Sequence, residues 1–184
     1  MIKERKPNRL PGYNYSQDNL YFVTSCVLYK ICCFGEITGP DRNLSEKQMI
    51  LNQYGQIAQQ QWYWLPEQYP YVVLHAFVVM PNHIHGIIEI NCGITVGTGR
   101  DLPLRRDLPL QSVITKIKSL SELMGAYKTT VSKQIHLLGY DEFNWQRSFH
   151  DHIIRNDVSY NNITNYINSN PLKWEEDTLH NNGK

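Results

Sequence analysis

The chain has 184 residues, of which 41% are hydrophobic and 19% charged, and its formal net charge is +1. This length predicts a single domain with a substantial core. The near-neutral charge excludes a polycationic protein, so any nucleic-acid contact has to come from local basic patches. No apolar run reaches the length of a membrane span and no hydrophobic signal region opens the chain, which predicts a cytosolic protein without membrane contact. The four cysteines contain no CxxC pair, which argues against a zinc ribbon.

The first third of the chain predicts a basic arm, a strand and a helix. Residues 1–19 are basic and rich in turn residues, and two interpretations stay open: a solvated tail or an arm that contacts phosphates. Aromatic and β-branched residues predict a strand over 20–28. Residues 31–39 are expected to extend the strand pairing. The pattern then becomes helical over 44–64, with Ser45 as the expected N-cap.

The next stretch places two histidines in a predicted β-hairpin. The runs 71–79 and 83–90 are rich in β-prone residues, and the proline–asparagine pair between them is typical of a turn. Because side chains alternate along a strand, His83 and His85 point to the same face. Two imidazoles on one face can bind a single metal ion. The alternative interpretation is that both only satisfy local hydrogen bonds.

The second half predicts two helices and one strand. A proline-containing repeat, Asp-Leu-Pro-Leu, indicates a flexible insertion at about 93–110. Apolar residues at helical spacing predict a helix over 112–135, followed by a strand over 149–154 and a helix over 157–170 that ends at a proline. A polar tail is expected over 175–184. The order βαββαβ followed by a helix predicts an α+β, ferredoxin-like sandwich with an antiparallel sheet and an extra C-terminal helix.

The final helix carries a second pair of polar residues, Tyr166 and Asn170. Residues four apart lie on one side of a helix, so the phenol and the amide point the same way. If they face the two histidines, Asn170 offers an oxygen ligand to a metal ion and Tyr166 lies beside it. Taken alone, the pair is equally consistent with two surface residues at a helix end.

This arrangement has a specific chemistry. A tyrosine hydroxyl with a pKa of about 10 is a poor nucleophile and needs activation to attack a phosphodiester. A metal ion would polarise the phosphate and stabilise the departing 3′ oxygen, and the attack would leave a 5′-phosphotyrosine and a free 3′-hydroxyl. Two nitrogens and one oxygen suit Mn²⁺ or Mg²⁺.

These segments resemble a known family. Met80-Pro-Asn-His-Ile-His-Gly86 is similar to the HUH motif (His, hydrophobic residue, His) of the single-tyrosine transposases, and 166–171 resembles their catalytic helix. The sequences at 10–16, 21–24, 34–37 and 145–155 are similar to the REP-associated branch of these insertion-sequence enzymes. The resemblance extends from about residue 8 to 174, apart from the insertion.

The resemblance implies a metal-dependent enzyme that cleaves and rejoins single-stranded DNA, often at hairpins, through a 5′-phosphotyrosine. It implies an HUH domain over 20–174, with His83, His85 and Asn170 as ligands of Mg²⁺ or Mn²⁺ and Tyr166 as nucleophile. Asn170 replaces the glutamine of the insertion-sequence enzymes, so the oligomeric state stays open between monomer and homodimer. A cytoplasmic, nucleoid-associated location is expected.

Several basic residues are candidates for DNA contact: Arg9, Lys116, Lys118, Lys128, Lys133, Arg147, His152 and Arg155. A second His-x-His sequence at 150–152 has an aspartate in the middle, which does not suit a buried strand position, so metal binding is not expected there. His75 is expected to be a core or supporting residue and Tyr127 a core residue. Tyr160 lacks a paired amide.

Two other functions remain open on the sequence. One is a DNA-hairpin-binding protein that keeps the fold without catalysis. The other is a metal-dependent hydrolase in which water attacks and Tyr166 orients the substrate. Covalent trapping separates the hydrolase from the transposase, because only attack by tyrosine leaves a protein–DNA adduct.

Overall fold

The computed structural model describes residues 10–39, 47–93 and 117–180. The elements, in chain order, are β1 (Asn19–Cys26), η1 (Leu28–Lys30), β2 (Gly35–Thr38), β3 (Gln48–Leu51), α1 (Gln53–Gln68), β4 (Val72–Met80), β5 (His83–Ile90), α2 (Leu120–Leu137), β6 (His150–Ile154), α3 (Asp157–Ser169) and η3 (Asn170–Glu176). In these ranges no helix combines the length and apolar character that crossing a membrane requires. Residues 1–9 of the expected arm and 94–110 of the expected insertion lie outside these ranges, and the expected domain limits stay a prediction.

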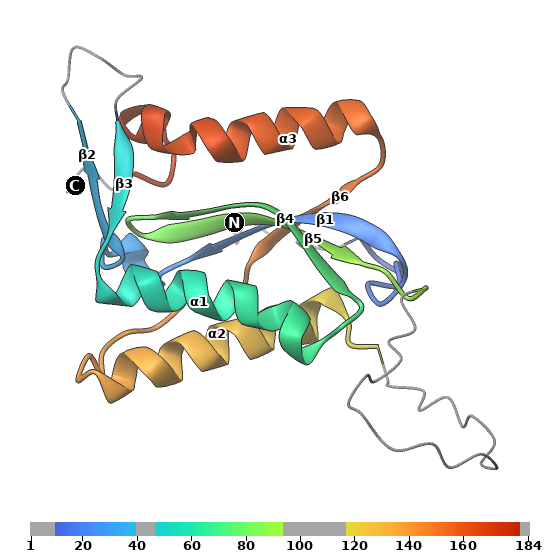
Figure 1. The fold of residues 1–184 in the computed structure, drawn as a ribbon, viewed down its shortest axis with the longest axis horizontal. Coiled ribbons are helices and arrows are strands. Elements are labelled where there is room, and N and C mark those ends of the chain that lie inside the picture. Colours follow the sequence, from blue (N-terminus) through green and yellow to red (C-terminus); the bar gives the residue numbers. More distant parts are fainter. Residues whose placement is uncertain (1–9, 40–46, 94–116, 181–184) are drawn as a thin grey trace, which may run out of the picture.

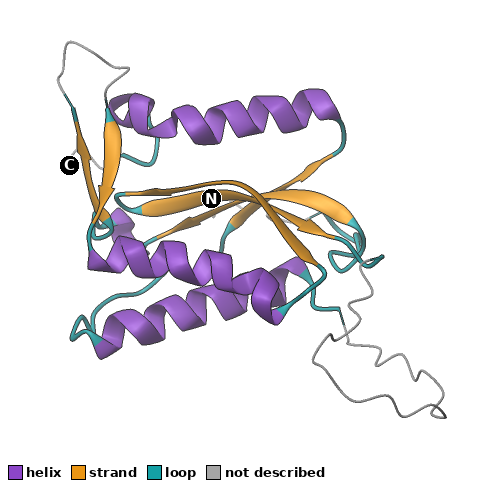
Figure 2. Cartoon of the chain, in the orientation of Figure 1, coloured by secondary structure: helices purple, strands orange, loops and turns teal. Residues whose placement is uncertain are grey.

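Four strands form one antiparallel sheet in the order β4-β5-β1-β6. Helices α1 and α2 cover one face of this sheet and α3 lies over the other (Figures 1 and 2). Two βαβ halves with this strand order define the ferredoxin-like sandwich. The predicted α+β fold with an extra C-terminal helix is therefore confirmed.

Strand β5 lies in the interior of the sheet and is buried on both faces. Its residues Ile84, Ile88 and Ile90 belong to the main core, with α1 and α2, whereas Ile87 packs in a smaller cluster with α3. This alternation explains why the strand reads as a nearly continuous apolar run. It also directs the two odd-numbered histidines towards α3.

The prediction of one helix over 44–64 is wrong at its start. Residues Gln48–Leu51 form β3, which pairs with β2 as a separate two-stranded sheet. The helix begins at Gln53 because Asn52 caps it: the Asn52 Oδ1 accepts hydrogen bonds from the backbone N–H groups of Tyr54 and Gly55. Ser45, the expected cap, lies outside the described residues.

The second helix also begins later than predicted. Ser119 and Glu122 form a capping box, in which each side chain accepts from the other residue's backbone N–H, and α2 starts at Leu120. The final α-helix ends at Ser169, close to the expected end, and the chain continues past Pro171 as η3.

A close packing contact at Gly86 gives the first prediction. A Cβ there would lie 2.4 and 2.6 Å from ring atoms of Trp62 and 3.0 Å from Phe77, and those two rings are stacked at 4.4 Å. We expect Gly86→Ala to lower the free energy of unfolding by about 1–3 kcal/mol, because the core has to shift. Urea unfolding measures this change.

The matched control is Gly125→Ala in α2, where a Cβ would meet no atom within 4 Å. Here we expect an increase of about 0.4–1 kcal/mol, because alanine restricts the unfolded chain. A Gly86→Ala protein as stable as the wild type would contradict the packing argument.

Candidate active site

The predicted histidine pair lies on the sheet face that α3 covers. His83 is opposite Cys26 and His85 opposite Thr24 on β1. Both imidazoles are buried, with exposed fractions of 0% and 2%. Their Nε2 atoms are 3.0 Å apart, so the two rings converge on one point as the strand period predicts.

The turn residue Asn82 determines which nitrogen of His83 is free. Its Nδ2 donates to the carbonyl oxygens of Lys30 and Leu179, so its Oδ1 faces the His83 Nδ1 at 2.7 Å. An amide oxygen only accepts, and therefore Nδ1 of His83 carries the proton. The Nε2 of His83 then presents a lone pair to the centre of the site.

His85 is held by Thr24, whose Oγ1 lies 2.8 Å from the His85 Nδ1. A hydroxyl both donates and accepts. Without a cation, Nε2–H of His85 can donate to the lone pair of His83 while Thr24 donates to Nδ1. With a cation at the centre, Nδ1–H donates to Thr24 and the Nε2 lone pair is free. Thr24 thus supports both tautomers.

Tyr166 projects from α3 onto this pair. Its hydroxyl is 3.2 Å from the His85 Nε2, and 44% of the residue is exposed. Partial burial raises the pKa of Tyr166, the negative charge of Asp177 raises it further, and a hydrogen bond with the Asn170 side chain opposes both. The surrounding residues alone therefore keep the phenol protonated at neutral pH.

Asn170 lies where α3 passes into η3, on the same side as Tyr166. The residue is 3% exposed, and its Oδ1 is a buried atom without a hydrogen-bond partner. A buried amide oxygen without a partner is costly. It is consistent with a ligand oxygen, the role that the sequence predicts.

Sequence reasoning missed Asp177, which was expected to belong to a polar tail. The Oδ1 of Asp177 accepts from the backbone N–H of Leu179, and its Oδ2 lies 3.7 Å from the His83 Nε2. One ligand atom from each of His83, His85 and Asp177 lies within 4.8 Å of the other two. The carboxylate reaches the histidines only because the segment after α3 folds back onto them, which no local sequence pattern indicates.

These residues fit a divalent cation by their donor chemistry. Two imidazole nitrogens and one carboxylate oxygen suit Mn²⁺, and harder ions such as Mg²⁺ accept the oxygens. Asp177 Oδ2, like Asn170 Oδ1, is buried without a hydrogen-bond partner. Asn82 and Thr24 supply the outer hydrogen bonds that orient ligand histidines.

The competing residues occupy other positions. Tyr127 is fully buried and its hydroxyl donates to the carbonyl oxygen of Ala58, as expected of a core residue. The Nδ1 of His75 lies 3.1 Å from the Tyr160 hydroxyl and its Nε2 lies 2.9 Å from the Glu89 Oε2, so His75 joins α3 to the sheet. The expectation about the 150–152 sequence is wrong in one respect, because its central Asp151 is 8% exposed. The strand alternation turns this aspartate inwards beside Val23 and leaves both histidines exposed.

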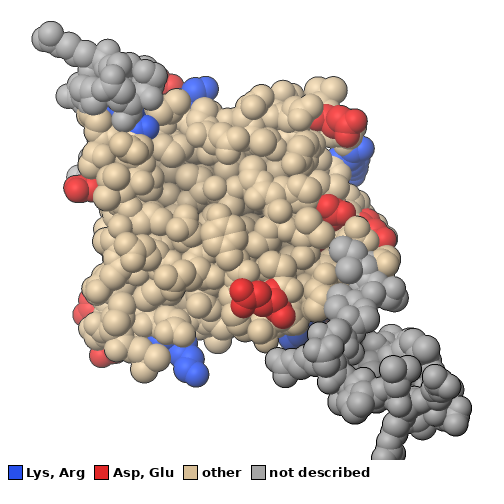
Figure 3. Space-filling model, in the orientation of Figure 1, with Lys and Arg blue, Asp and Glu red and all other residues tan. Residues whose placement is uncertain are grey.

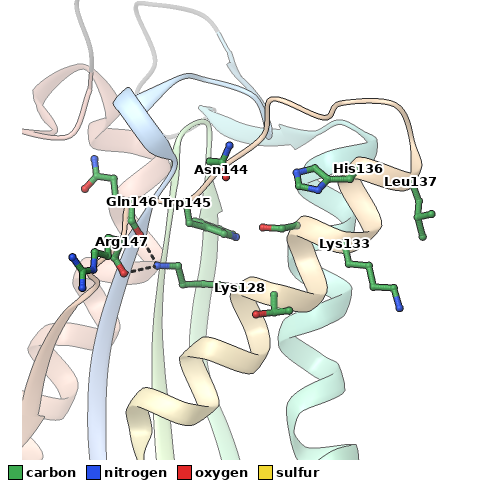
Figure 4. Close-up of a pocket in the computed structure, with 10 residues that line it drawn as sticks. Lys128, Lys133, His136, Leu137, Asn144, Trp145, Gln146 and Arg147 are labelled. Atoms are coloured by element: carbon green, nitrogen blue, oxygen red, sulfur yellow. Dashed lines mark hydrogen bonds between the residues drawn. The ribbon is translucent and has the colours of Figure 1, made fainter.

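Five of the candidate DNA contacts line two separate depressions. Lys128, Lys133 and Arg147 line a depression of about 710 Å³ between α2 and the segment before β6, where Lys128 donates to two backbone carbonyls (Figure 4). His152 and Arg155 line a different depression beside α3. Lys118 lies over the ring of Tyr69. The remaining two, Arg9 and Lys116, lie outside the described residues.

The side of the molecule in Figure 3 shows no continuous basic surface among the described residues. The Lys and Arg side chains visible there are few and lie near the rim, beside Asp and Glu. This distribution agrees with the formal net charge of +1.

Comparison with known proteins identifies the fold. The chain is similar to the structure of a REP-associated tyrosine transposase bound to a REP hairpin, with a TM-score of 0.54 and 20% identity, over 90% of this chain and 73% of that one. The architecture is therefore a transposase-like α+β fold.

The chain is also 37% identical over 180 residues to an uncharacterized protein of Haemophilus influenzae, covering 97% of this chain and 94% of that protein. The two proteins belong to the same family. No family model matches. The REP-associated branch stays a prediction.

The buried histidines give a pH prediction for the metal-free protein. Burial lowers the pKa of His83 and of His85 to about 3, from 6.5 when exposed. The unfolded chain therefore binds more protons below pH 6.5, and stability should fall as the pH drops from 6.5 towards 3. The loss is up to about 1.4 kcal/mol per pH unit for each histidine.

Urea unfolding in EDTA between pH 7 and 4 measures this slope. We expect the free energy of unfolding of His85→Gln to depend less steeply on pH than that of the wild type. The difference corresponds to about one proton fewer taken up on unfolding, since one buried imidazole has been removed. Equal slopes in the two proteins would contradict the assignment.

Proposed function

We propose that the protein is a metal-dependent endonuclease and strand transferase of the transposase type. It cleaves and rejoins single-stranded DNA through a 5′-phosphotyrosine on Tyr166. The observation that carries this proposal is the 3.2 Å contact between the Tyr166 hydroxyl and the His85 Nε2, in a cluster that also holds His83 and Asp177. No other described tyrosine combines partial exposure with a place at two converging imidazoles.

The residues divide the work as follows. His83, His85 and Asp177 would hold the ion, with the Asn170 Oδ1 as a further oxygen ligand. When bound, the ion would polarise the scissile phosphate and offset the charge on the departing oxygen. The negative charge of Asp177 raises the pKa of Tyr166. The positive charge of the ion would oppose this effect.

The covalent step is a transesterification. The Tyr166 oxygen attacks the phosphorus, a P–O bond to tyrosine forms, and the P–O bond to the 3′ oxygen breaks. The phenolic proton leaves to solvent, since the residue is 44% exposed, and the departing 3′ oxygen takes up a proton from solvent. Because a phosphodiester replaces a phosphodiester, the free 3′-hydroxyl can reverse the step or attack after exchange of strands.

Hairpin DNA is the proposed substrate. The similar transposase structure is bound to a REP hairpin, and Lys128, Lys133 and Arg147 together line one depression. We propose that this depression contacts the phosphates of the hairpin stem. It lies on the α2 side of the molecule, so the stem and the cleaved strand would occupy different faces.

A covalent-adduct assay tests the reaction. Incubation with end-labelled hairpin DNAs that carry single-stranded flanks, in Mn²⁺, should give a denaturation-resistant protein–DNA band. We expect Tyr166→Phe to abolish this band and EDTA to prevent it, while the control Tyr63→Phe, an exposed tyrosine of α1, retains it.

Two outcomes would overturn the assignment. Cleavage without an adduct would indicate a hydrolase in which water attacks. Tight hairpin binding with neither cleavage nor adduct, across a pool of varied hairpins, would indicate a protein that only binds DNA.

The metal ligands can be tested apart from the reaction. We expect Asp177→Asn to weaken Mn²⁺ binding by about 10- to 100-fold, because the ion loses its only negatively charged ligand among the residues proposed here. The rise in melting temperature with Mn²⁺ concentration measures the affinity. The matched control is Glu176→Gln, which removes an exposed carboxylate next to Asp177 in the sequence. Wild-type affinity in Asp177→Asn, with loss in Asn170→Ala, would leave Asn170 as the third ligand instead.

A further inference from the structure

The sheet face that α3 covers also carries a groove near Tyr166. Helix α3 makes most of its sheet contacts with β4 and β5. The groove has a volume of about 510 Å³ and lies between β6 and α3. Its volume falls in the range of about 300–1,000 Å³ that is usual for small-molecule sites.

The strand register gives the floor of this groove. Phe22 on β1 is directly opposite His152 on β6, and Thr24 is opposite His150. Opposite residues of an antiparallel pair share a face, and residues two apart do as well. The floor is therefore a phenyl ring beside two exposed imidazoles, on the same face as His85.

The groove is continuous with the candidate active site through Phe22. The Phe22 ring lines the groove, stacks on His85 with 5.4 Å between ring centroids, and meets the Tyr166 ring edge-on at 6.1 Å. A ligand group seated in the groove would thus lie one ring away from the nucleophile.

Among the residues that the structure describes, the lining of the groove is aromatic and amide-rich and includes no Lys, Arg, Asp or Glu: Phe22, His150, His152, Asn156, Val158, Ser159, Asn162 and Ile163. Flat rings favour stacking with a nucleobase, and amides and hydroxyls hydrogen-bond its edges. A phosphate site would need cations or several free N–H groups. The groove does include the first turn of α3, but the N–H of Ser159 there already donates to the Asn156 Oδ1. The chemistry therefore favours a base over a phosphate.

We propose that this groove is a base-binding subsite for the nucleotide next to the scissile phosphate of single-stranded DNA. The inference rests on the proposed function, because the nucleophile defines where the scissile phosphate lies. In this arrangement the base is held against Phe22 and the two imidazoles, with Asn162 at its edge. The subsite positions the strand for attack by Tyr166 and contributes to sequence preference at the cleavage point.

Adjacent asparagines of α3 provide a matched pair of variants. Asn162 lines the groove and Asn161 does not, and both are exposed. Asn162→Glu places a carboxylate in the groove, whereas Asn161→Glu adds the same charge to the same helix outside it. Since each change is at an exposed helix position, both proteins should fold, and their melting temperatures check this.

The assay measures equilibrium binding in EDTA, without cleavage. The probes are fluorescein-labelled oligo(dT) and an abasic strand of equal length. Stacking of about 1–3 kcal/mol per base predicts that the wild type prefers the base-containing strand by about 5- to 150-fold. Asn162→Glu should lose most of this preference, and Asn161→Glu should keep it. The imidazole proton resonances of His150 and His152 should shift on addition of oligo(dT) and not on addition of the abasic strand.

The subsite would be overturned if Asn162→Glu and Asn161→Glu preferred oligo(dT) over the abasic strand equally. It would also be overturned if the imidazole resonances of His150 and His152 did not shift on addition of oligo(dT). The adduct assay distinguishes this failure from failure of the proposed function. A Tyr166 adduct without base-dependent binding in the groove refutes the subsite alone. Base-dependent binding without any adduct supports the groove as a DNA site and refutes the enzyme.

Discussion

The organisation of the site depends on two neutral imidazoles that are buried with their Nε2 atoms 3.0 Å apart. Two lone pairs cannot face each other at this distance without a proton or a cation between them. Asn82 fixes the proton of His83 on the other nitrogen, so the point of convergence has to be satisfied by His85 or by a ligand. The Asn170 Oδ1 and the Asp177 Oδ2 are also buried without hydrogen-bond partners, and both would be stabilised by a positive charge at this point.

The rest of the fold holds this centre in place. Interior strand β5 provides the two histidines, and the main core on its opposite face makes their position rigid. A smaller cluster of Ile87, Ile154 and Ile167 seats α3 on the sheet, and the hydrogen bond between His75 and Tyr160 joins the helix to β4. The carbonyl oxygen of Leu179, which accepts from Asn82, ties the C-terminal segment to the histidine turn. Nucleophile, ligands and supporting residues thus come from elements far apart in the sequence.

Much of this could be predicted from local periodicity. The strand period of two predicted that His83 and His85 share a face, and the helical spacing of four predicted that Tyr166 and Asn170 do. The order of the elements predicted the ferredoxin-like sandwich. The β2–β3 hairpin was missed because the residues before Asn52 suit a helix or a strand, and pairing with residues 35–38 decides between them.

The sequence by itself determined which residue types carry the chemistry and on which face of their own element they lie, because these properties depend on neighbours within a few positions. Tertiary structure decided what those faces meet. It brought Asp177 to the histidines, gave Asn82 the orientation that sets the tautomer of His83, and turned Asp151 inwards while leaving the β6 histidines along an open groove. Each depends on contacts between residues far apart in the chain, which no local pattern encodes.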